Sequence, residues 1–194
     1  AAETNPELAR TAARLIARGM GSDPMPLVEA AQANPRAQAL VSHLARILTG
    51  RAWDPERAPR ALARLLEPPL ALLELRPETF LSICAHLLEQ RALTLTDIRP
   101  WLDSPGRLRL FLWLLASYLG NPSRSFPPLP HDALERMLEG ADADTRSVYY
   151  DLLWADGSAE STGRLAAALA REQDESARRH GAARLRARLL ENGA

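Results

Sequence analysis

The chain has 194 residues, 46% of them hydrophobic and 25% charged, which is enough apolar material for a sizeable core and excludes a disordered chain. Its 24 basic and 24 acidic residues give a formal net charge of zero, which excludes a general electrostatic attraction to nucleic acid or to anionic membranes. Only 5% of the residues are aromatic, so burial must come mainly from leucine and alanine, and an all-α fold is predicted.

Capping residues followed by proline mark the expected helix starts in the first half of the chain. These starts are Asn5-Pro6, Asn34-Pro35 and Asp54-Pro55. A short helix is expected over 25–33, and the helix after residue 35 carries the most regular apolar stripe, with His43 beside it. His43 therefore looks like a boundary histidine rather than a ligand.

Two prolines, Pro68-Pro69, end the helix that follows residue 55, because proline disfavours helical geometry in the residue before it. An apolar turn over 70–75 leads to a helix that begins at Pro77. Its apolar stripe consists of Phe80, Ile83, Cys84, Leu87 and Leu88. Thr96 is expected to cap a short piece that ends at residue 102.

The stretch 104–120 is the most apolar part of the chain. Ser104 can cap a helix, Pro105 suits its first turn, and Gly120 provides a stop. A helix that is apolar on every side must be covered on every side. The run is shorter than the roughly 18–20 apolar residues that span a bilayer, so we expect a central helix over 105–119 that its neighbours bury completely.

Residues 121–130 contain four prolines and cannot be helical, so they form either an ordered crossing loop or a polyproline II arm. Two helices with acidic surfaces are expected over 131–138 and 145–154. A helical hairpin over 163–172 and 175–190 completes the chain.

The overall prediction is a single all-α domain, 1–194, of about ten short helices. Two architectures stay open: a globular multi-helix domain around helix 105–119, or an irregular array of helical pairs of the HEAT type.

Candidate catalytic and metal-binding residues are sparse. No two of the four histidines have the spacing that places two ligands together on one helix. Cys84, the single cysteine, lies on an expected core face, where its thiol would be inert. Neither a nucleophile elbow nor a phosphate-binding glycine loop is present. We therefore expect no hollow equipped for reactions, no cofactor, no metal and no enzymatic activity.

An Arg-rich last helix suggests nucleic-acid binding as an alternative function. Arg179 and Arg186 share one face of this helix and could contact phosphates. Equally, nearby acidic residues or the acidic helices at 131–151 could neutralise them, and the net charge of zero favours that interpretation.

Protein binding is the leading prediction. Acidic residues gather at 132–156 and basic ones at 178–188, an arrangement that can steer a partner. Aromatic side chains of the kind found in interface hot spots accompany this pattern. The expected partner-binding residues are Phe126, Tyr149, Tyr150, Trp154, Arg179 and Arg186.

Composition and the absence of a recognisable targeting segment give the expected source and compartment. All the basic residues are arginines, and alanine, leucine, proline and glycine are abundant, as in proteins from GC-rich bacterial genomes. The expected protein is a bacterial adaptor, chaperone or inhibitor of a partner protein. No segment resembles a signal peptide or a membrane span, so we expect a cytoplasmic protein, or a periplasmic one if Ala1 is a processed N-terminus.

Overall fold

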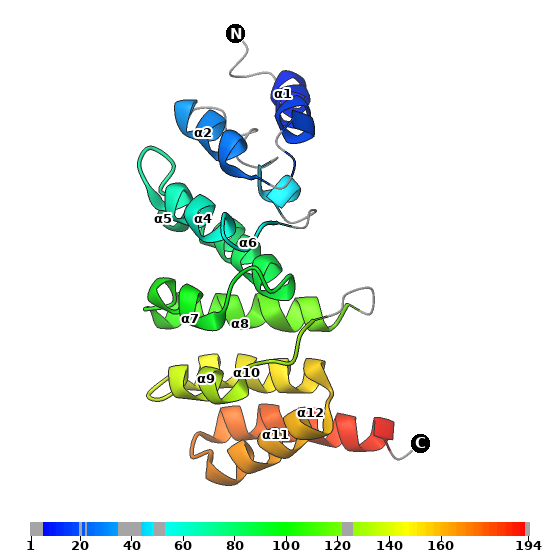
Figure 1. The fold of residues 1–194 in the computed structure, drawn as a ribbon. Helices are drawn as coiled ribbons and strands as arrows, with labels where there is room; N and C mark the ends of the chain where they lie inside the picture. The colour runs from blue at the N-terminus through cyan, green and yellow to red at the C-terminus, as the bar shows by residue number, and fades with distance from the viewer. Residues whose placement is uncertain are drawn as a thin grey trace. The chain divides into compact units, whose positions relative to one another are not determined.

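The computed structural model describes residues 6–19, 21, 23–34, 44–48, 53–121 and 126–192. Within these ranges the backbone forms helices, turns and loops without any strand, which confirms the all-α fold class (Figure 1). The helices group into two compact units, Ala1–Ile98 and Arg99–Ala194. The single domain expected from the sequence, 1–194, stays a prediction.

In the first unit, helices that are neighbours in sequence pack against each other. The pairs in contact are α1 with α2, α2 with α4, α4 with α5, and α5 with α6. The helices are α1 (Pro6–Gly19), α2 (Met25–Ala33), α4 (Ala58–Leu66), α5 (Leu72–Leu75), α6 (Pro77–Glu89) and α7 (Leu95–Ile98). Residues 44–48 are also helical, whereas His43 lies outside the described residues.

The best-buried helix of the first unit is α6. Every residue of its predicted apolar stripe is buried, and so are Leu81, Ala85 and His86 on its other sides. Eight of its thirteen residues are thus buried. Cys84 is one of them, with no exposed surface, and burial raises the pKa of its thiol far above the ordinary value. This confirms that Cys84 lies on the core face of its helix.

Two predicted helix starts of the first unit are wrong. Asp54 accepts a hydrogen bond from the Glu56 backbone N–H at 2.9 Å within a turn, and α4 begins only at Ala58. Thr94, rather than Thr96, starts α7. The Thr94 N–H donates to Asp97 Oδ2 at 2.8 Å, and the Asp97 N–H donates back to the Thr94 hydroxyl at 3.3 Å. This reciprocal pair is a capping box, which Thr96 cannot form because the acidic partner lies one residue after it.

In the second unit, α10 is the helix on which the others pack. It contacts α8 on one side and both α11 and α12 on the other, so that the unit has three successive layers (Figure 1). The elements are a 3₁₀ turn (Arg99–Trp101), α8 (Pro105–Leu119), α9 (His131–Met137), α10 (Ala143–Asp156), α11 (Ala159–Arg171) and α12 (Glu175–Asn192).

Helix α8 has the predicted bounds and the predicted cap, since the Ser104 hydroxyl accepts from the Arg107 N–H at 3.3 Å. Its burial differs from the prediction. The buried side chains define one face, whereas Trp113 is 55% exposed. Complete coverage of this helix is therefore a wrong prediction, because an apolar residue can stay at the surface without destabilising the fold.

Short, capped connections position α10, α11 and α12. The Asp142 and Ser158 side chains accept hydrogen bonds from N–H groups in the first turns of α10 and α11, at 2.7 and 3.1 Å. Gly181 allows α12 to approach closely, because a Cβ atom there would lie 2.8 Å from Tyr150 Cδ2 and 2.5 Å from Leu169 Cδ2. Helix α12 therefore packs directly against the ring of Tyr150.

The proline-rich segment before α9 is described over 126–130, and this part is an irregular strap. Leu129 is buried and Phe126 is half-buried, so the strap packs on the unit instead of projecting as a free arm. Among the described helices, none is long and apolar enough to cross a membrane.

Candidate functional site

An open cleft of about 670 Å³ lies in the second unit between α9, α10 and the C-terminal end of α11. Its volume is in the range of sites that hold a small molecule or a short segment of chain. The side chains that line it are mostly polar and include Asp132, Glu135, Arg136, Arg146 and Glu172. The sequence analysis predicted no hollow equipped for reactions, and it did not predict a cleft at this place.

Two tyrosines from α10 form the floor of the cleft. Tyr149 and Tyr150 are each only 3% exposed, and each hydroxyl is bonded to a carboxylate. Tyr149 donates to Glu135 Oε1 at 3.3 Å, and Tyr150 donates to Glu172 Oε2 at 2.5 Å. Burial first, and the adjacent carboxylates second, raise the pKa of both phenols well above the ordinary value. The floor therefore has fixed, un-ionised hydroxyl groups.

Glu172 is the anchor at one end of the floor. Arg146 binds it in a bidentate pair, from Nε at 2.8 Å and from Nη2 at 2.9 Å. The backbone N–H of Asp174 donates to the same carboxylate at 2.9 Å. With the Tyr150 hydroxyl, these donors saturate a side chain that is only 3% exposed. They lower the pKa of Glu172 to about 2, Arg146 being the largest cause.

Arg164 organises the other end of the cleft. Its guanidinium bonds Glu135 Oε1 at 3.1 Å and Asp132 Oδ1 at 2.8 Å, and it also pairs with Glu160 at 3.0 Å. Arg164 therefore joins α11 to α9. Because three carboxylates share one arginine, this end of the cleft is net acidic.

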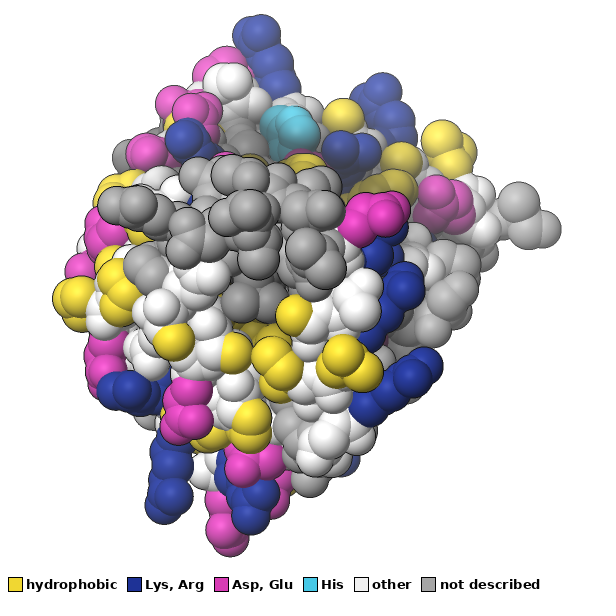
Figure 2. Space-filling model, turned by 90° about the horizontal axis from the view of Figure 1, so that it is seen from above, with side chains coloured by type: hydrophobic (Ala, Val, Ile, Leu, Met, Phe, Trp, Pro, Cys, Tyr) yellow, Lys and Arg dark blue, Asp and Glu magenta, His cyan; other side chains and the backbone are white. Residues whose placement is uncertain are grey.

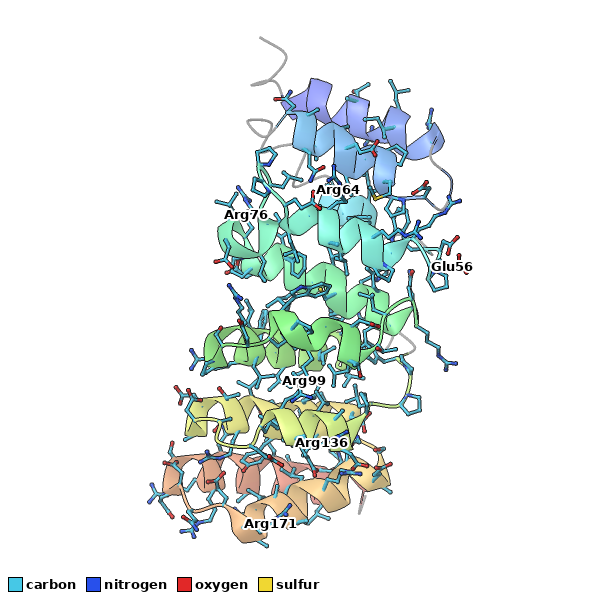
Figure 3. All side chains as sticks on the ribbon, turned by 60° about the vertical axis from the view of Figure 1, so that its left-hand side comes forward. Glu56, Arg64, Arg76, Arg99, Arg136 and Arg171 are labelled. Carbon is cyan, nitrogen blue, oxygen red and sulfur yellow. The ribbon has the colours of Figure 1, made fainter. Side chains whose placement is uncertain are left out.

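Two arginines on the walls of the cleft differ from Arg146 and Arg164, which lie at its ends. Arg136 belongs to α9 and Arg171 to the end of α11 (Figure 3). Arg136 Nε donates to the Asp132 carbonyl at 3.1 Å, and Arg171 Nε donates to the Ala167 carbonyl at 3.3 Å. Both are exposed, and neither has a carboxylate partner among the described residues. These two guanidiniums can bind an incoming anionic group.

The six residues predicted for partner binding do not form one surface. Tyr149 and Tyr150 meet in the cleft floor, as buried residues rather than exposed ones. Trp154 is half-buried under two arginines of α12, with the Arg184 and Arg188 guanidinium carbons 4.8 and 5.7 Å from its ring centroid. The remaining three lie outside the cleft: Phe126 in the strap, and Arg179 and Arg186 exposed on α12.

The arginines of α12 are largely occupied within the unit. Arg184 Nε lies 2.6 Å from Asp151 Oδ1, which His180 Nε2 also contacts at 2.8 Å. Arg188 donates to the Trp154 carbonyl, and Arg179 pairs with Glu175 at 2.8 Å. The acidic and basic segments seen in the sequence thus meet partly with each other, across the contact between α10 and α12.

A second polar cluster, which the sequence did not reveal, lies buried between α9 and α11. Ser161 Oγ donates to Asp156 Oδ2 and lies 3.0 Å from His131 Nε2. Ser161 has no exposed surface and His131 is only 5% exposed. In a hydrolase triad the histidine stands between the acid and an accessible serine. Here the serine stands in the middle and is buried, so the cluster connects α9, α10 and α11 and offers no nucleophile to a substrate.

Neither a metal site among the described residues nor a match to a known protein indicates a function. Within the described ranges, no three His, Cys, Asp or Glu side chains lie close enough together to hold a metal ion. Comparisons with protein-family models, curated proteins and solved structures find no match. The geometry of the cleft is therefore what indicates a function.

The sequence analysis did not select the cleft residues Glu135, Arg136, Arg146, Arg171 and Glu172, nor Arg164, which holds one end of the cleft without lining it. They are ordinary charged residues of amphipathic helices, and no motif distinguishes them. The one available signal was the acidic surface of 131–138, which was interpreted as steering a partner.

Proposed function

We propose that this chain is a non-catalytic protein-binding module and that its cleft receives a segment of another protein. The observation that carries the proposal is the open cleft with a fixed polar floor and two wall arginines, Arg136 and Arg171, that have no carboxylate partner in the described part of the chain. A bacterial adaptor, chaperone or inhibitor that acts in the cytoplasm is the form of this function that we favour.

The state of the floor supports binding rather than catalysis. A general base must reach the proton that it removes. Glu172 instead accepts hydrogen bonds from Arg146, Tyr150 and the Asp174 N–H, which leave little of its carboxylate for a substrate. Tyr149 and Tyr150 already donate their hydroxyl protons to carboxylates. These groups hold the walls of the cleft in place, as a recognition surface requires.

Nucleic-acid binding through the last helix is the alternative, and the contacts of α12 do not favour it. Arg184, Arg188 and Arg179 all have partners inside the unit. The view from above in Figure 2 is centred on parts of the chain other than α12, and there too arginine side chains lie among acidic and apolar ones. Titration of the protein with labelled DNA and RNA at low salt, with an R179E/R186E variant beside it, tests this alternative. Phosphate-mediated binding would fall steeply as salt rises.

A steric block of the cleft tests the protein-binding proposal. Ala168 lines the cleft from α11, whereas Ala166 is exposed on the same helix outside it. We expect an immobilised wild-type chain and the A166W variant to retain the same protein from a lysate of the source organism, and A168W to lose it. Equal capture by all three proteins would contradict a role for the cleft.

A further inference from the structure

We propose that the segment bound in the cleft presents an aspartate or glutamate side chain to Arg136 and Arg171. This inference rests on the proposed function and adds the chemistry of the partner. The occupant is a short, extended or turn-forming segment of a partner protein, with the acidic side chain toward the wall arginines and apolar side chains beside it.

The pairing of charges inside the cleft leads to this chemistry. Arg146 is satisfied by Glu172, and Arg164 is satisfied by the carboxylates of α9 together with Glu160. The guanidiniums of Arg136 and Arg171 are the lining cations, within the described part of the chain, that donate only to backbone carbonyls. Positive charge is therefore available at Arg136 and Arg171, whereas the floor is neutralised; Glu139 is the lining carboxylate without a partner among the described residues.

The two arginines face the same cleft from different helices. Arg136 extends from α9 and Arg171 from the end of α11 (Figure 3). A guanidinium presents a planar fork of donors that matches the two oxygens of a carboxylate. Each wall can therefore donate to a carboxylate of the bound segment, from Arg136 on α9 and from Arg171 on α11.

The rest of the lining fits a segment of protein chain. Leu138, Ala141 and Ala168 provide apolar contacts close to the wall arginines. Asp132 and Glu135, which share Arg164 with Glu160, lie on α9 within one turn of Arg136 and give that part of the cleft an acidic character. A basic group beside the acidic one in the bound segment would meet carboxylates there.

Selection from a library of random linear peptides, displayed and panned against the full chain, tests the inference. Panning in parallel against A168W removes peptides that bind outside the cleft. We expect the cleft-dependent peptides to be enriched in Asp or Glu. A selected peptide, labelled with a fluorophore, and its Asn or Gln analogue are then titrated by fluorescence anisotropy.

Matched double variants assign the contact. R136Q/R171Q removes both wall charges, and R60Q/R99Q removes two exposed arginines outside the cleft that have no carboxylate partner among the described residues. We expect R136Q/R171Q to bind the acidic peptide about tenfold more weakly and R60Q/R99Q to change its affinity by less than about twofold. The amide analogue should bind the wild type as weakly and lose little more on R136Q/R171Q, because the same contact is already absent.

The outcomes separate the two proposals. Cleft-dependent peptides without acidic residues, or equal affinity for wild type and R136Q/R171Q, overturn the acidic partner and leave the protein-binding function standing. Displacement of the peptide by inorganic phosphate, beyond that by chloride at equal ionic strength, overturns it in favour of a phosphoryl ligand. If no selected peptide distinguishes wild type from A168W, both proposals fail.

Discussion

Tyr149 and Tyr150 are adjacent in sequence, yet their hydroxyls bond carboxylates on two different walls of the cleft. Successive residues of a helix are rotated by roughly 100°. Tyr149 therefore reaches Glu135 on α9, and Tyr150 reaches Glu172 after α11. Each carboxylate is in turn held by an arginine, Arg164 or Arg146. The two tyrosines thus connect α10 to α9 and to the end of α11.

Glu172→Gln should destabilise the protein and change its dependence on pH. The folded-state pKa of Glu172 is about 2, against an ordinary value of 4.5 for an unfolded chain. A lowered pKa means that the pair with Arg146 contributes fully above pH 4.5 and is lost as the pH falls towards 2. The difference corresponds to roughly 3 kcal/mol of folding free energy. Urea unfolding of both proteins across this range measures it.

Glu139→Gln is the control for that substitution. Glu139 is exposed and has no partner among the described residues, so its loss should leave the free energy of unfolding nearly unchanged. Wild type should lose stability between pH 4.5 and 2 more steeply than E172Q does. Parallel stability curves for the two proteins would mean that Glu172 is not held as described.

At this scale the sequence predicts local contacts and misses distant ones. The Ser104 cap was predicted because its partner, Arg107, lies in the first turn of the same helix. The partners of Glu172 come from positions 146 and 150, which only the packing of α10 beside α11 brings near. Both tyrosines were selected as functional candidates for their residue type, and the sequence offered no reason to link them to Glu135 or Glu172.

Among the elements, apolar patterning predicts where helices lie better than it predicts how they pack. Helices α2 and α8 have the expected bounds. The helix that the others surround in the second unit is nevertheless α10 and not the more apolar α8. The buried positions of α10 include Tyr149 and Tyr150, whose hydroxyls find partners only in the folded unit. Their burial therefore could not be read from hydropathy.

Two helical glycines provide a matched test of the packing between α10, α11 and α12. In Gly181→Ala the added methyl group would lie 2.8 Å from the Tyr150 ring and 2.5 Å from Leu169. We expect a loss of about 1–3 kcal/mol in the free energy of unfolding, as for overpacked cores. Gly163→Ala, on α11, meets nothing within 4 Å and should gain about 1 kcal/mol because alanine favours the helix.

Thermal and urea unfolding of the two glycine variants measure these changes. The same chemical change, glycine to alanine, is expected to lower the free energy of unfolding in G181A and to raise it in G163A. A destabilised G163A would show that helix propensity is not what limits α11. An unaffected G181A would mean that α12 does not approach Tyr150 as closely as described, and the fixed floor of the cleft would lose its support.

The division of the chain into two compact units bears on the prediction of a single domain. The sequence shows no composition shift or linker at residues 98–99, so the boundary between the units could not be predicted from it. The boundary arises from long-range contacts, which composition does not encode. Every residue that lines the cleft comes from the second unit. The cleft can therefore be separated from the first unit by experiment.

A fragment of residues 99–194 should fold alone and keep the cleft. This unit has its own core, to which α8 contributes Phe111 and Leu112 and α10 contributes Leu152 and Leu153, all with no more than 1% exposure. Its length lies within the usual range for independent domains, roughly 50–250 residues. We expect helical circular dichroism, one cooperative unfolding transition, and binding of the acidic peptides selected on the full chain with loss on R136Q/R171Q. A fragment without helical structure would instead support one cooperative domain over 1–194, with the cleft dependent on the whole chain.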